Sequence, residues 1–459
     1  MADADHIAKI VSRLPRDFVW GTATSACQVE GAALAEGRKA SIWDDFARRP
    51  GATKHGNTPE TACDHYHRWA EDVTLLTGLG MGAYRFSLSW SRLLPDGIGA
   101  VNPKGFDFYK RLLAALREAD IVPYVTLYHW DLPSVLQEKG GWTNRDILRW
   151  FGEYVDAVIR HLGADIPNFI VLNEPSVVAY VGHYEGVHAP GIKSAAAMYA
   201  AMHHLNLVHG QSMRQIKAAF PRAQAASTYT HFPIYPLNDS AESTRAAQLM
   251  RAVWSDGFFG PLFRGEYPRE IAGQIAPFVR EGDLDLCRTP GDFLGLNHYC
   301  PDYAKPAAEE LPARLTFAHN AGKIEPIGTT DLGWPIVPDG LYDALVDLKT
   351  RYAPQRIIIT EGGCAFNDEP GPDGRIRDRR RIDYYAAYLD AALRAREEGV
   401  PLEGYFAWSF LDNFEWAEGY GPRFGLVHVD YDGGLKRTPK DSYFWFRDLL
   451  RAHKAKAAA

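Results

Sequence analysis

The sequence is poor in cysteine, has no long apolar run and carries no block of one charge sign, and each of these gaps excludes a class of protein. Five scattered cysteines, an odd number, suit neither a disulfide framework nor a paired metal site, so we expect reduced thiols in the cytoplasm. No window approaches the roughly 18 to 20 apolar residues that cross a membrane. Residues 1–14 mix charged and apolar side chains and so lack the apolar core of a secretion signal.

The charge balance argues against polyanionic partners. The chain has 50 Lys and Arg against 57 Asp and Glu, and the net charge of −7 is spread along the sequence. Nucleic acids and anionic membranes select basic patches, so we expect neither as a partner. Hydrophobic residues make up 46% of the 459 residues, which is enough for a large core.

Short β-rich runs alternate with longer segments of helical periodicity. The runs predicted as strands are Phe18–Ser25, Ala83–Ser89, Val122–His129, Asn168–Asn173, Ala223–Thr230, Phe293–Tyr299, Arg356–Glu361 and Gly404–Ser409. The clearest helical segments are Lys104–Ala119, Asn144–His161, Ala195–Ala219 and Asp378–Glu398. This alternation favours one closed (β/α)8 barrel over an open doubly wound sheet.

We therefore predict a single domain over residues 1–459, with a core from about residue 16 to about residue 451 and short flexible termini. The segments Pro301–Pro338 and Asp368–Asp378 are rich in proline, glycine and charge and follow the sixth and seventh predicted strands. Loops at that end of barrel strands build active sites. We expect both segments to lie near one.

Polar side chains stand where several predicted strands end, although a buried parallel strand should be apolar along its length. The third strand ends at His129, the fourth at Asn173 and Glu174, the sixth near Asn297 and the seventh at Glu361. The carboxyl ends of barrel strands converge on one mouth, so these side chains are expected to share a pocket. Two carboxyls in such a pocket are what glycosidic hydrolysis needs, one to protonate the leaving oxygen and one to attack or stabilise the anomeric carbon.

Two matters stay open at this point. A single Glu at a strand end is more often an ion-pair partner than a catalyst, so the interpretation depends on the pair and its polar and aromatic neighbours. The sequence also does not give the separation of the carboxyls, which is about 5–5.5 Å for retention and about 6.5–9.5 Å for inversion of configuration.

Separated motifs carry a family resemblance. They are Gln28-Val29-Glu30-Gly31, Tyr84-Arg85-Phe86-Ser87, His129-Trp130-Asp131, Asn173-Glu174-Pro175, His188-Ala189-Pro190-Gly191, Thr360-Glu361-Gly362-Gly363 and the run from Trp408 to Trp416. In this order the chain resembles glycoside hydrolase family 1, the β-glucosidase family, from Phe18 to about Phe446. The resemblance implies a (β/α)8 barrel that hydrolyses terminal β-D-glucosyl residues with retention, β-galactosides and β-fucosides being secondary substrates.

The resemblance also implies residue roles. Glu174 would be the acid/base and Glu361 the nucleophile, with Arg85 and Tyr299 keeping Glu361 ionised while Glu174 holds its proton. The residues implied as substrate ligands are Gln28, His129, Asn173, Asn297, Tyr299, Trp334, Trp408, Glu415, Trp416 and Phe424. Trp408 would be the stacking floor, and Trp334 would flank the leaving group unless it is a core residue under a long loop. No metal or organic cofactor is needed, because the two carboxyls supply acid, base and nucleophile.

The chain departs from the family pattern at three places. Gly362 stands where Asn usually follows the nucleophile, Cys27 replaces an aromatic residue and His298 replaces a common Tyr. These departures put in doubt the support around the site rather than the catalytic pair.

Phosphorylated substrates are not expected. Relatives that act on 6-phosphorylated sugars have Ser, Lys and Tyr where this chain has Glu415, Pro422 and Phe424, and a carboxylate at position 415 would repel a phosphate. Two other functions stay in competition with hydrolysis: a transglycosylating enzyme, and a non-catalytic sugar-binding barrel.

Overall fold

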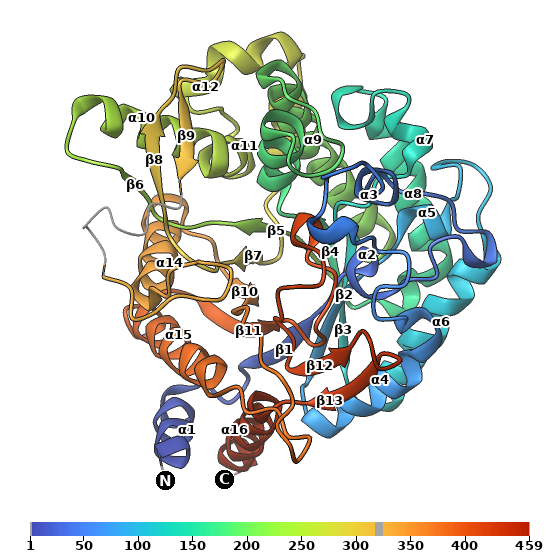
Figure 1. Ribbon diagram of the computed structural model, residues 1–459. Coiled ribbons are helices and arrows are strands. Elements are labelled where there is room, and N and C mark those ends of the chain that lie inside the picture. Colours follow the sequence, from blue (N-terminus) through green and yellow to red (C-terminus); the bar gives the residue numbers. More distant parts are fainter. Residues whose placement is uncertain (1, 317–324, 459) are drawn as a thin grey trace.

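The computed structural model describes residues 2–316 and 325–458, and its centre is a closed barrel of parallel strands (Figure 1). Around the barrel the order is β1, β11, β10, β7, β5, β4, β3, β2. Their bounds are β1 Val19–Ala23, β2 Ala83–Ser87, β3 Val122–Tyr128, β4 Asn168–Asn173, β5 Gln224–Thr230, β7 Leu294–Asn297, β10 Ile357–Gly362 and β11 Leu402–Trp408. The predicted barrel is confirmed, and each predicted strand overlaps an observed one.

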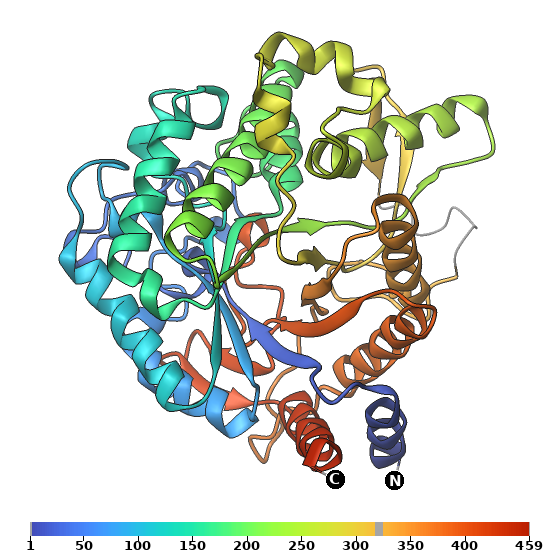
Figure 2. The ribbon, with the colours of Figure 1, turned by 180° about the vertical axis from the view of Figure 1, so that it is seen from behind.

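Helices follow the strands and cover the outside of the barrel, as both ribbon views show (Figures 1 and 2). The long ones are α4 His65–Leu79, α6 Pro103–Glu118, α8 Ile147–Leu162, α9 Ala195–Ala219, α14 Pro338–Tyr352, α15 Arg379–Glu397 and α16 Asp441–Ala458. The shorter ones are α2 Ala26–Val29, α3 Ile42–Ala47, α5 Trp90–Leu93, α7 Ser134–Gln137, α10 Ala241–Arg251, α11 Gly257–Arg264, α12 Arg269–Ile275 and α13 Asp283–Cys287. In α8, Ile147, Phe151, Val155, Val158 and Leu162 recur at helical spacing and are all buried, so this apolar face packs inward.

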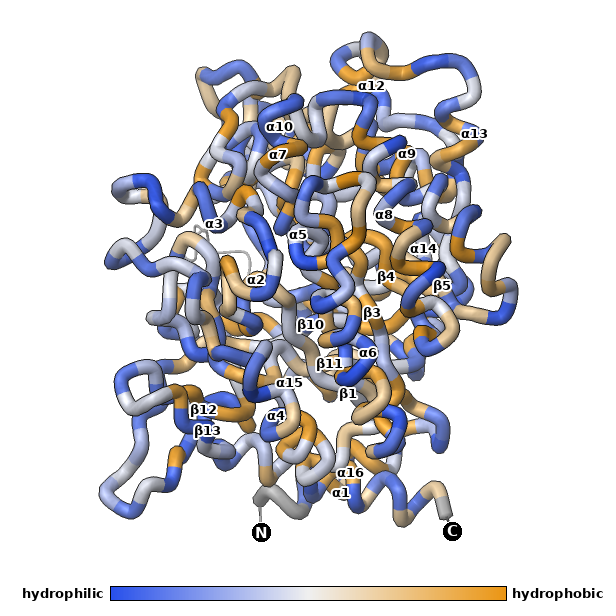
Figure 3. Tube along the Cα trace, turned by 90° about the vertical axis from the view of Figure 1, so that its right-hand side faces the viewer, coloured by the Kyte–Doolittle hydropathy of each residue, from blue (hydrophilic) through white to orange (hydrophobic). Residues whose placement is uncertain are grey.

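The inside of the barrel is filled with side chains. Tyr124, Ile170, Phe293, Ile358 and Phe406 form one buried cluster contributed by β3, β4, the start of β7, β10 and β11. In Figure 3 the hydrophobic stretches of chain likewise concentrate in the interior, and the outer loops are hydrophilic. A packed centre means that a substrate pocket has to open at an end of the barrel.

The two ends of the chain pack on one another. Helix α1, Ala2–Arg13, lies against α15 and α16 and buries Ile10, Val11 and Leu14, and Lys456 Nζ donates to the Leu14 carbonyl at 2.8 Å. Both termini lie at the same edge of the molecule in Figures 1 and 2. The described ends are thus helical, and the core bounds of about residues 16–451 with short flexible termini stay a prediction.

The predicted insertion Pro301–Pro338 contains extra strands. Strands β8 Asp302–Pro306 and β9 Ala313–Thr316 join β6 Ile234–Pro236 in a three-stranded sheet; residues 317–324 of this insertion lie outside the described residues. Strands β12 Val427–Asp430 and β13 Lys436–Pro439 form an antiparallel pair. Among the described helices, none has the length and apolar character needed to cross a membrane.

Candidate active site

A pocket of about 430 Å³ opens at the carboxyl ends of the barrel strands and gathers most of the residues singled out in the sequence. Those that line it are His129, Glu174, Tyr299, Trp334, Glu361, Trp408, Glu415, Trp416 and Phe424. The other four, Gln28, Arg85, Asn173 and Asn297, are almost completely buried and hydrogen-bond to lining residues from behind. Residues from β2, β3, β4, β7, β10 and β11 with their following loops, and from the segment after β1, therefore meet at one mouth.

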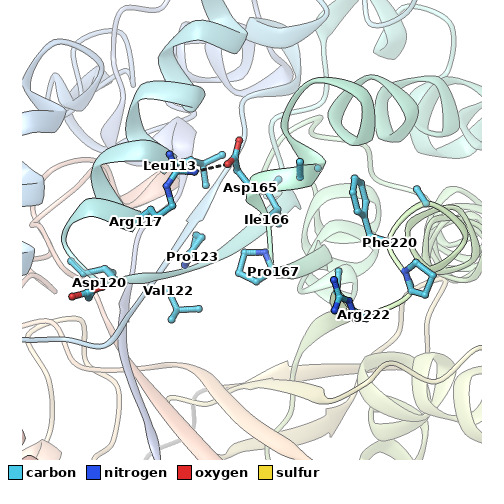
Figure 4. Close-up of a pocket in the computed structure, with 16 residues that line it drawn as sticks. Leu113, Arg117, Asp120, Val122, Pro123, Asp165, Ile166, Pro167, Phe220 and Arg222 are labelled. Atoms are coloured by element: carbon cyan, nitrogen blue, oxygen red, sulfur yellow. Dashed lines mark hydrogen bonds and ion pairs between the residues drawn. The ribbon is translucent and has the colours of Figure 1, made fainter.

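A larger hollow, about 880 Å³, lies at the opposite end of the barrel, where β3, β4 and β5 begin (Figure 4). Its floor is apolar, with Val122, Ile166 and Phe220. Two of its charged side chains, Arg117 and Asp165, pair with each other at 2.7 Å and are exposed. By size alone this hollow would be the candidate active site. The buried carboxyl groups that could act in catalysis, those of Glu174 and Glu361, lie in the smaller pocket instead.

Glu361, the last residue but one of β10, is buried, and its carboxyl accepts hydrogen bonds from two side-chain donors. Arg85 from β2 donates Nη1–H to Oε1 of Glu361, and the Tyr299 hydroxyl donates to Oε2 at 2.7 Å. Burial raises the pKa of Glu361, and the Arg85 guanidinium and the Tyr299 phenol act against that rise. The two donors therefore act in the direction expected from the sequence, although burial is the larger influence.

Glu174 directly follows β4 and has no cation in hydrogen-bond contact among the described residues. Its Oε1 accepts the Nδ2–H of Asn297 at 2.9 Å. Burial, followed by the negative charge of Glu361, raises the pKa of Glu174 to about 8. Burial thus raises the pKa of both carboxyls, but Glu361 accepts from a cation and a phenol that act against the rise, whereas Glu174 accepts from a neutral amide.

One polar network joins the two carboxyls. Arg85 Nη2 donates to Asn173 Oδ1 at 2.6 Å, and Asn297 Nδ2 donates to the same oxygen at 3.1 Å. The same guanidinium contacts Glu361 and the same amide contacts Glu174. The carboxyls are therefore linked through one guanidinium and two amides.

Backbone irregularities aim these side chains. The pairing register shifts between Ile359 and Glu361 on β10, and between Ile170 and Asn173 on β4; such bulges re-aim side chains beside active sites. Glu174, Trp130 and Trp416 all have positive φ, at 44°, 76° and 52°. Non-glycine residues adopt this conformation at a cost of about 1 to 3 kcal/mol, and three of them line this pocket.

The wall below the pocket mouth is aromatic and amide-rich. Asn173 Nδ2 donates to His129 Nε2 at 3.0 Å, and burial keeps the pKa of His129 well below its usual value, so this imidazole is neutral. The Trp408 and His129 rings stack at 5.9 Å between centroids. Gln28 Nε2 donates to Glu415 Oε2 at 3.4 Å, so amide, imidazole and carboxyl groups stand beside an indole face.

The outer wall contains residues that the sequence reasoning missed. They include Val177 and Tyr180 from η5, Val177–Glu185, the helix that follows Glu174, together with Phe232 and Trp254. Trp334 lines the same region, with its ring centroid 5.5 Å from that of Tyr299. An apolar helix directly after the Asn-Glu-Pro motif was the available signal for Val177 and Tyr180.

The three departures from the family pattern have local structural accounts. A Cβ at Gly362 would lie 2.5 Å from the Tyr405 hydroxyl, so a larger residue there requires Tyr405 to move. His298 is buried with Nδ1 3.0 Å from the His231 carbonyl oxygen. Cys27 is buried, and burial holds the pKa of its thiol well above the usual value, so it is not a reactive thiolate.

Comparison with known proteins gives the family. The family model for glycosyl hydrolase family 1 matches residues 10–455. The chain belongs to that family. Beta-glucosidase A of Thermotoga maritima is 42% identical over 96% of this chain and 98% of its own length. The bifunctional beta-D-glucosidase/beta-D-fucosidase of Bifidobacterium breve is 38% identical over 96% of this chain and 99% of its own.

A solved structure agrees with this membership. The Thermotoga maritima beta-glucosidase in complex with deoxynojirimycin matches with a TM-score of 0.88 at 41% identity, covering 96% of this chain and 99% of that one. The family 1 resemblance drawn from the motifs is confirmed, and the protein is a glycoside hydrolase.

Proposed function

We propose that this family 1 enzyme is a retaining β-glucosidase in which Glu361 is the nucleophile and Glu174 the acid/base. The observation that carries the proposal is the difference between the hydrogen-bond donors of the two carboxyls. Glu361 receives hydrogen bonds from Arg85 and Tyr299, whereas Glu174 has a pKa raised to about 8. A nucleophile must be ionised and a general acid must hold its proton, which is the distribution that these environments favour.

The mechanism follows from those protonation states. In the first step a Glu361 oxygen attacks the anomeric carbon while Glu174 gives its proton to the leaving oxygen, so that the glycosidic bond breaks and an ester to Glu361 forms. In the second step Glu174, now a carboxylate, takes a proton from water, and the water oxygen displaces Glu361 from the anomeric carbon. Two displacements at one carbon retain its configuration.

The glycone would sit against the aromatic and amide-rich wall. We assign hydroxyl recognition to Gln28, His129, Asn173, Glu415 and Trp416. Paired donors and acceptors suit vicinal hydroxyls, and the Trp408 face suits the C–H side of a pyranose. Asn297 and Tyr299 would act beside the reacting carbon, with Phe424 closing the floor near C6 and Trp334 flanking the leaving group.

The substrate is proposed to be an unphosphorylated β-glucoside or oligosaccharide, cellulose-derived ones included, with β-galactosides and β-fucosides as secondary substrates. The printed activities of the Bifidobacterium breve relative support the secondary activity. Burial raises the pKa of Glu415 to about 8, so repulsion of a phosphate by this residue is weaker than the sequence reasoning assumed. A stronger argument against a phosphorylated substrate is the supply of cations. Among the described residues, Lys54 is the one Lys or Arg that lines the pocket, and it already pairs with Glu418.

We place the enzyme in the cytoplasm. All five cysteines are buried and none is disulfide-bonded, as is usual in a reducing compartment.

Labelling tests the mechanism. A 2-deoxy-2-fluoro-β-glucosyl fluoride slows the second step, so peptide mapping should find the label on Glu361, and a label elsewhere refutes the assignment. Glu174→Ala should lose roughly 10² to 10⁴-fold in kcat/KM on glucosides with poor leaving groups. With an activated glucoside, whose leaving group needs no proton, added azide should restore turnover as β-glucosyl azide, because azide attacks the glycosyl-enzyme without a general base; recovery of the α-anomer would refute retention.

A further inference from the structure

A buried hydrogen-bond chain that plays no part in the mechanism above ends on Glu174. The Thr228 hydroxyl of β5 lies 3.1 Å from the Thr360 hydroxyl of β10, and Thr360 Oγ1 lies 2.9 Å from Asn297 Oδ1 of β7. Asn297 Nδ2 then donates to Glu174 Oε1 at 2.9 Å. Thr228, Thr360 and Asn297 have no measurable exposure.

Arg85 fixes the direction of every bond in this chain. A guanidinium can only donate, so Asn173 Oδ1 accepts from Arg85 Nη2. Asn297 contacts that same oxygen at 3.1 Å and must therefore present its NH2 group there. Its carbonyl oxygen is then left facing Thr360, which has to donate its one proton to it, so Thr228 has to donate to Thr360.

The reverse orientation of Asn297 is penalised twice. It would set Asn297 Oδ1 against Asn173 Oδ1, and it would set the same oxygen against Glu174 whenever Glu174 is ionised. Unpaired acceptors buried in contact cost roughly 1 to 3 kcal/mol each. The two threonines add to this preference. In the reverse orientation Thr360 would accept from Asn297 and donate to Thr228, which leaves the Thr228 proton without an acceptor among the described hydrogen bonds.

The surrounding backbone keeps the hydrogen-bond chain from Thr228 to Glu174 in place. A Cβ at Gly295 of β7 would overlap the Thr228 hydroxyl oxygen, so glycine leaves the room that this hydroxyl occupies. The Thr228 carbonyl also accepts the backbone N–H of Glu174 at 2.9 Å. Thr228 therefore contacts the strand that carries Asn297 and the residue that carries the acid.

We propose that Thr360 and Thr228 are positioning residues for the acid/base, which fix the Asn297 amide so that its N–H always faces Glu174 Oε1 and the acid proton is held on Oε2. The inference rests on the proposed function of Glu174. As acid, Glu174 then offers its proton from one defined oxygen. As base, it keeps a neutral donor on the other oxygen in both halves of the reaction.

The hydrogen-bond chain that ends on Glu174 consists of uncharged side chains. The titratable and charged groups that face Glu174 are Glu361 of β10, Arg85 of β2, Tyr299 after β7 and Glu415 after β11. A threonine-to-valine change leaves all of these in place and keeps the side-chain shape. A shift in the titration of Glu174 in such a variant therefore reports the amide.

The test compares Thr360→Val with Thr360→Ser, which keeps the hydroxyl. In Thr360→Val the Asn297 carbonyl loses its donor, so the amide is held less firmly and the carboxylate of Glu174 is less stabilised. We expect the basic limb of the kcat/KM profile to move up by about 0.5 to 1 pH unit. We also expect kcat/KM for a glucoside with a poor leaving group to fall roughly tenfold, with Thr360→Ser close to wild type.

Leaving-group dependence separates this effect from damage to Glu361, the chain neighbour of Thr360. A dinitrophenol leaves without a proton, so kcat/KM for dinitrophenyl β-glucoside should change less than about twofold in Thr360→Val. Thr228→Val, on a different strand, should move the basic limb in the same direction by a smaller amount. If Thr360→Val does not fold, Thr228→Val carries the test alone.

An unshifted basic limb, or an equal loss on both substrates, overturns the inference. The proposed function fails in a different way, namely when Glu174→Ala retains wild-type rates on poor leaving groups. A normal Glu174→Ala phenotype with an unshifted Thr360→Val profile therefore removes only the positioning role.

Discussion

The hydroxyl of Tyr299 offers the sharpest test of the nucleophile's environment. It donates to Glu361 Oε2 at 2.7 Å inside a buried site. Tyr299→Phe removes this donor and keeps the ring, whose centroid lies 5.5 Å from that of Trp334 and 6.1 Å from that of Phe424. The Arg85 contact with Glu361 is untouched, so one hydrogen bond is deleted from an otherwise intact pocket.

The magnitude follows from the charge on the acceptor. A hydrogen bond to a charged group contributes about 1.5 to 3 kcal/mol, and one pKa unit corresponds to about 1.36 kcal/mol. Losing a donor destabilises the carboxylate, so the pKa of Glu361 should rise by about 1 to 2 units. Because Glu361 acts as the ionised form, the acidic limb of the kcat/KM profile should move to higher pH by that amount.

The assay is the pH dependence of kcat/KM for an aryl glucoside, measured on the purified enzyme. Tyr384→Phe is the control, because its hydroxyl points to the Tyr299 carbonyl at 3.5 Å and contacts neither carboxyl. The control should leave both limbs in place. An acidic limb that stays at its wild-type position in Tyr299→Phe would refute the reasoning, since a donor that stabilises the carboxylate cannot be removed without raising its pKa.

Three further predictions follow from other parts of the molecule. First, kcat/KM should fall as pH rises through about 8, because Glu174, with a pKa raised to about 8, must be protonated to act as acid; a pH profile that stays level there contradicts the assignment. Second, Lys440→Met should destabilise the fold by about 3 kcal/mol in urea unfolding, because the buried Asp412 loses its partner at 2.9 Å and keeps only the longer contact with Arg423 at 3.4 Å; a loss below 1 kcal/mol would contradict a buried charge, and the matched variant Lys456→Met, at the packed termini, should lose less. Third, Trp334→Ala should raise KM for phenyl glucosides about tenfold, at roughly 1 to 1.5 kcal/mol for the lost ring contact, while inhibition by glucose stays nearly constant; equal weakening of glucose binding would place Trp334 on the glycone side.

The barrel was predictable because every one of its strands has to be apolar on both faces. Each is buried on both faces, so it appears in the sequence as a short apolar run followed by a helical period, as with Asn168–Asn173 and then Ala195–Ala219. The terminal helix α1 was not predicted. Among the residues of this region whose burial is described, Ile10, Val11 and Leu14 are buried, and packing on α15 and α16 stabilises this short apolar face.

The wall that we propose binds the glycone was predictable for a different reason. Glu361 and Asn297 are polar residues at the ends of apolar strands, where burial makes a polar side chain conspicuous. The outer wall carries no such contrast, because Val177, Tyr180 and Trp254 are apolar or aromatic residues in helices and look like core residues in sequence. Thr360 and Thr228 are equally inconspicuous, since threonine is a common strand residue and only the bond directions reveal what their hydroxyls contact.

This difference between the two sides of the pocket has a consequence for how substrate range can change. Glu415 and Trp416 follow directly on Asp412, which is buried, accepts the Gly425 N–H at 2.8 Å and pairs with Lys440 at 2.9 Å. Substitutions that shift this loop to fit another glycone therefore act on a buried charge, and they lose stability along with position. Val177, Phe232 and Leu315 contribute apolar surface to the outer wall, where we propose that the leaving group binds, so leaving-group preference is expected to change there by ordinary apolar substitution, usually at less than about 1.5 kcal/mol.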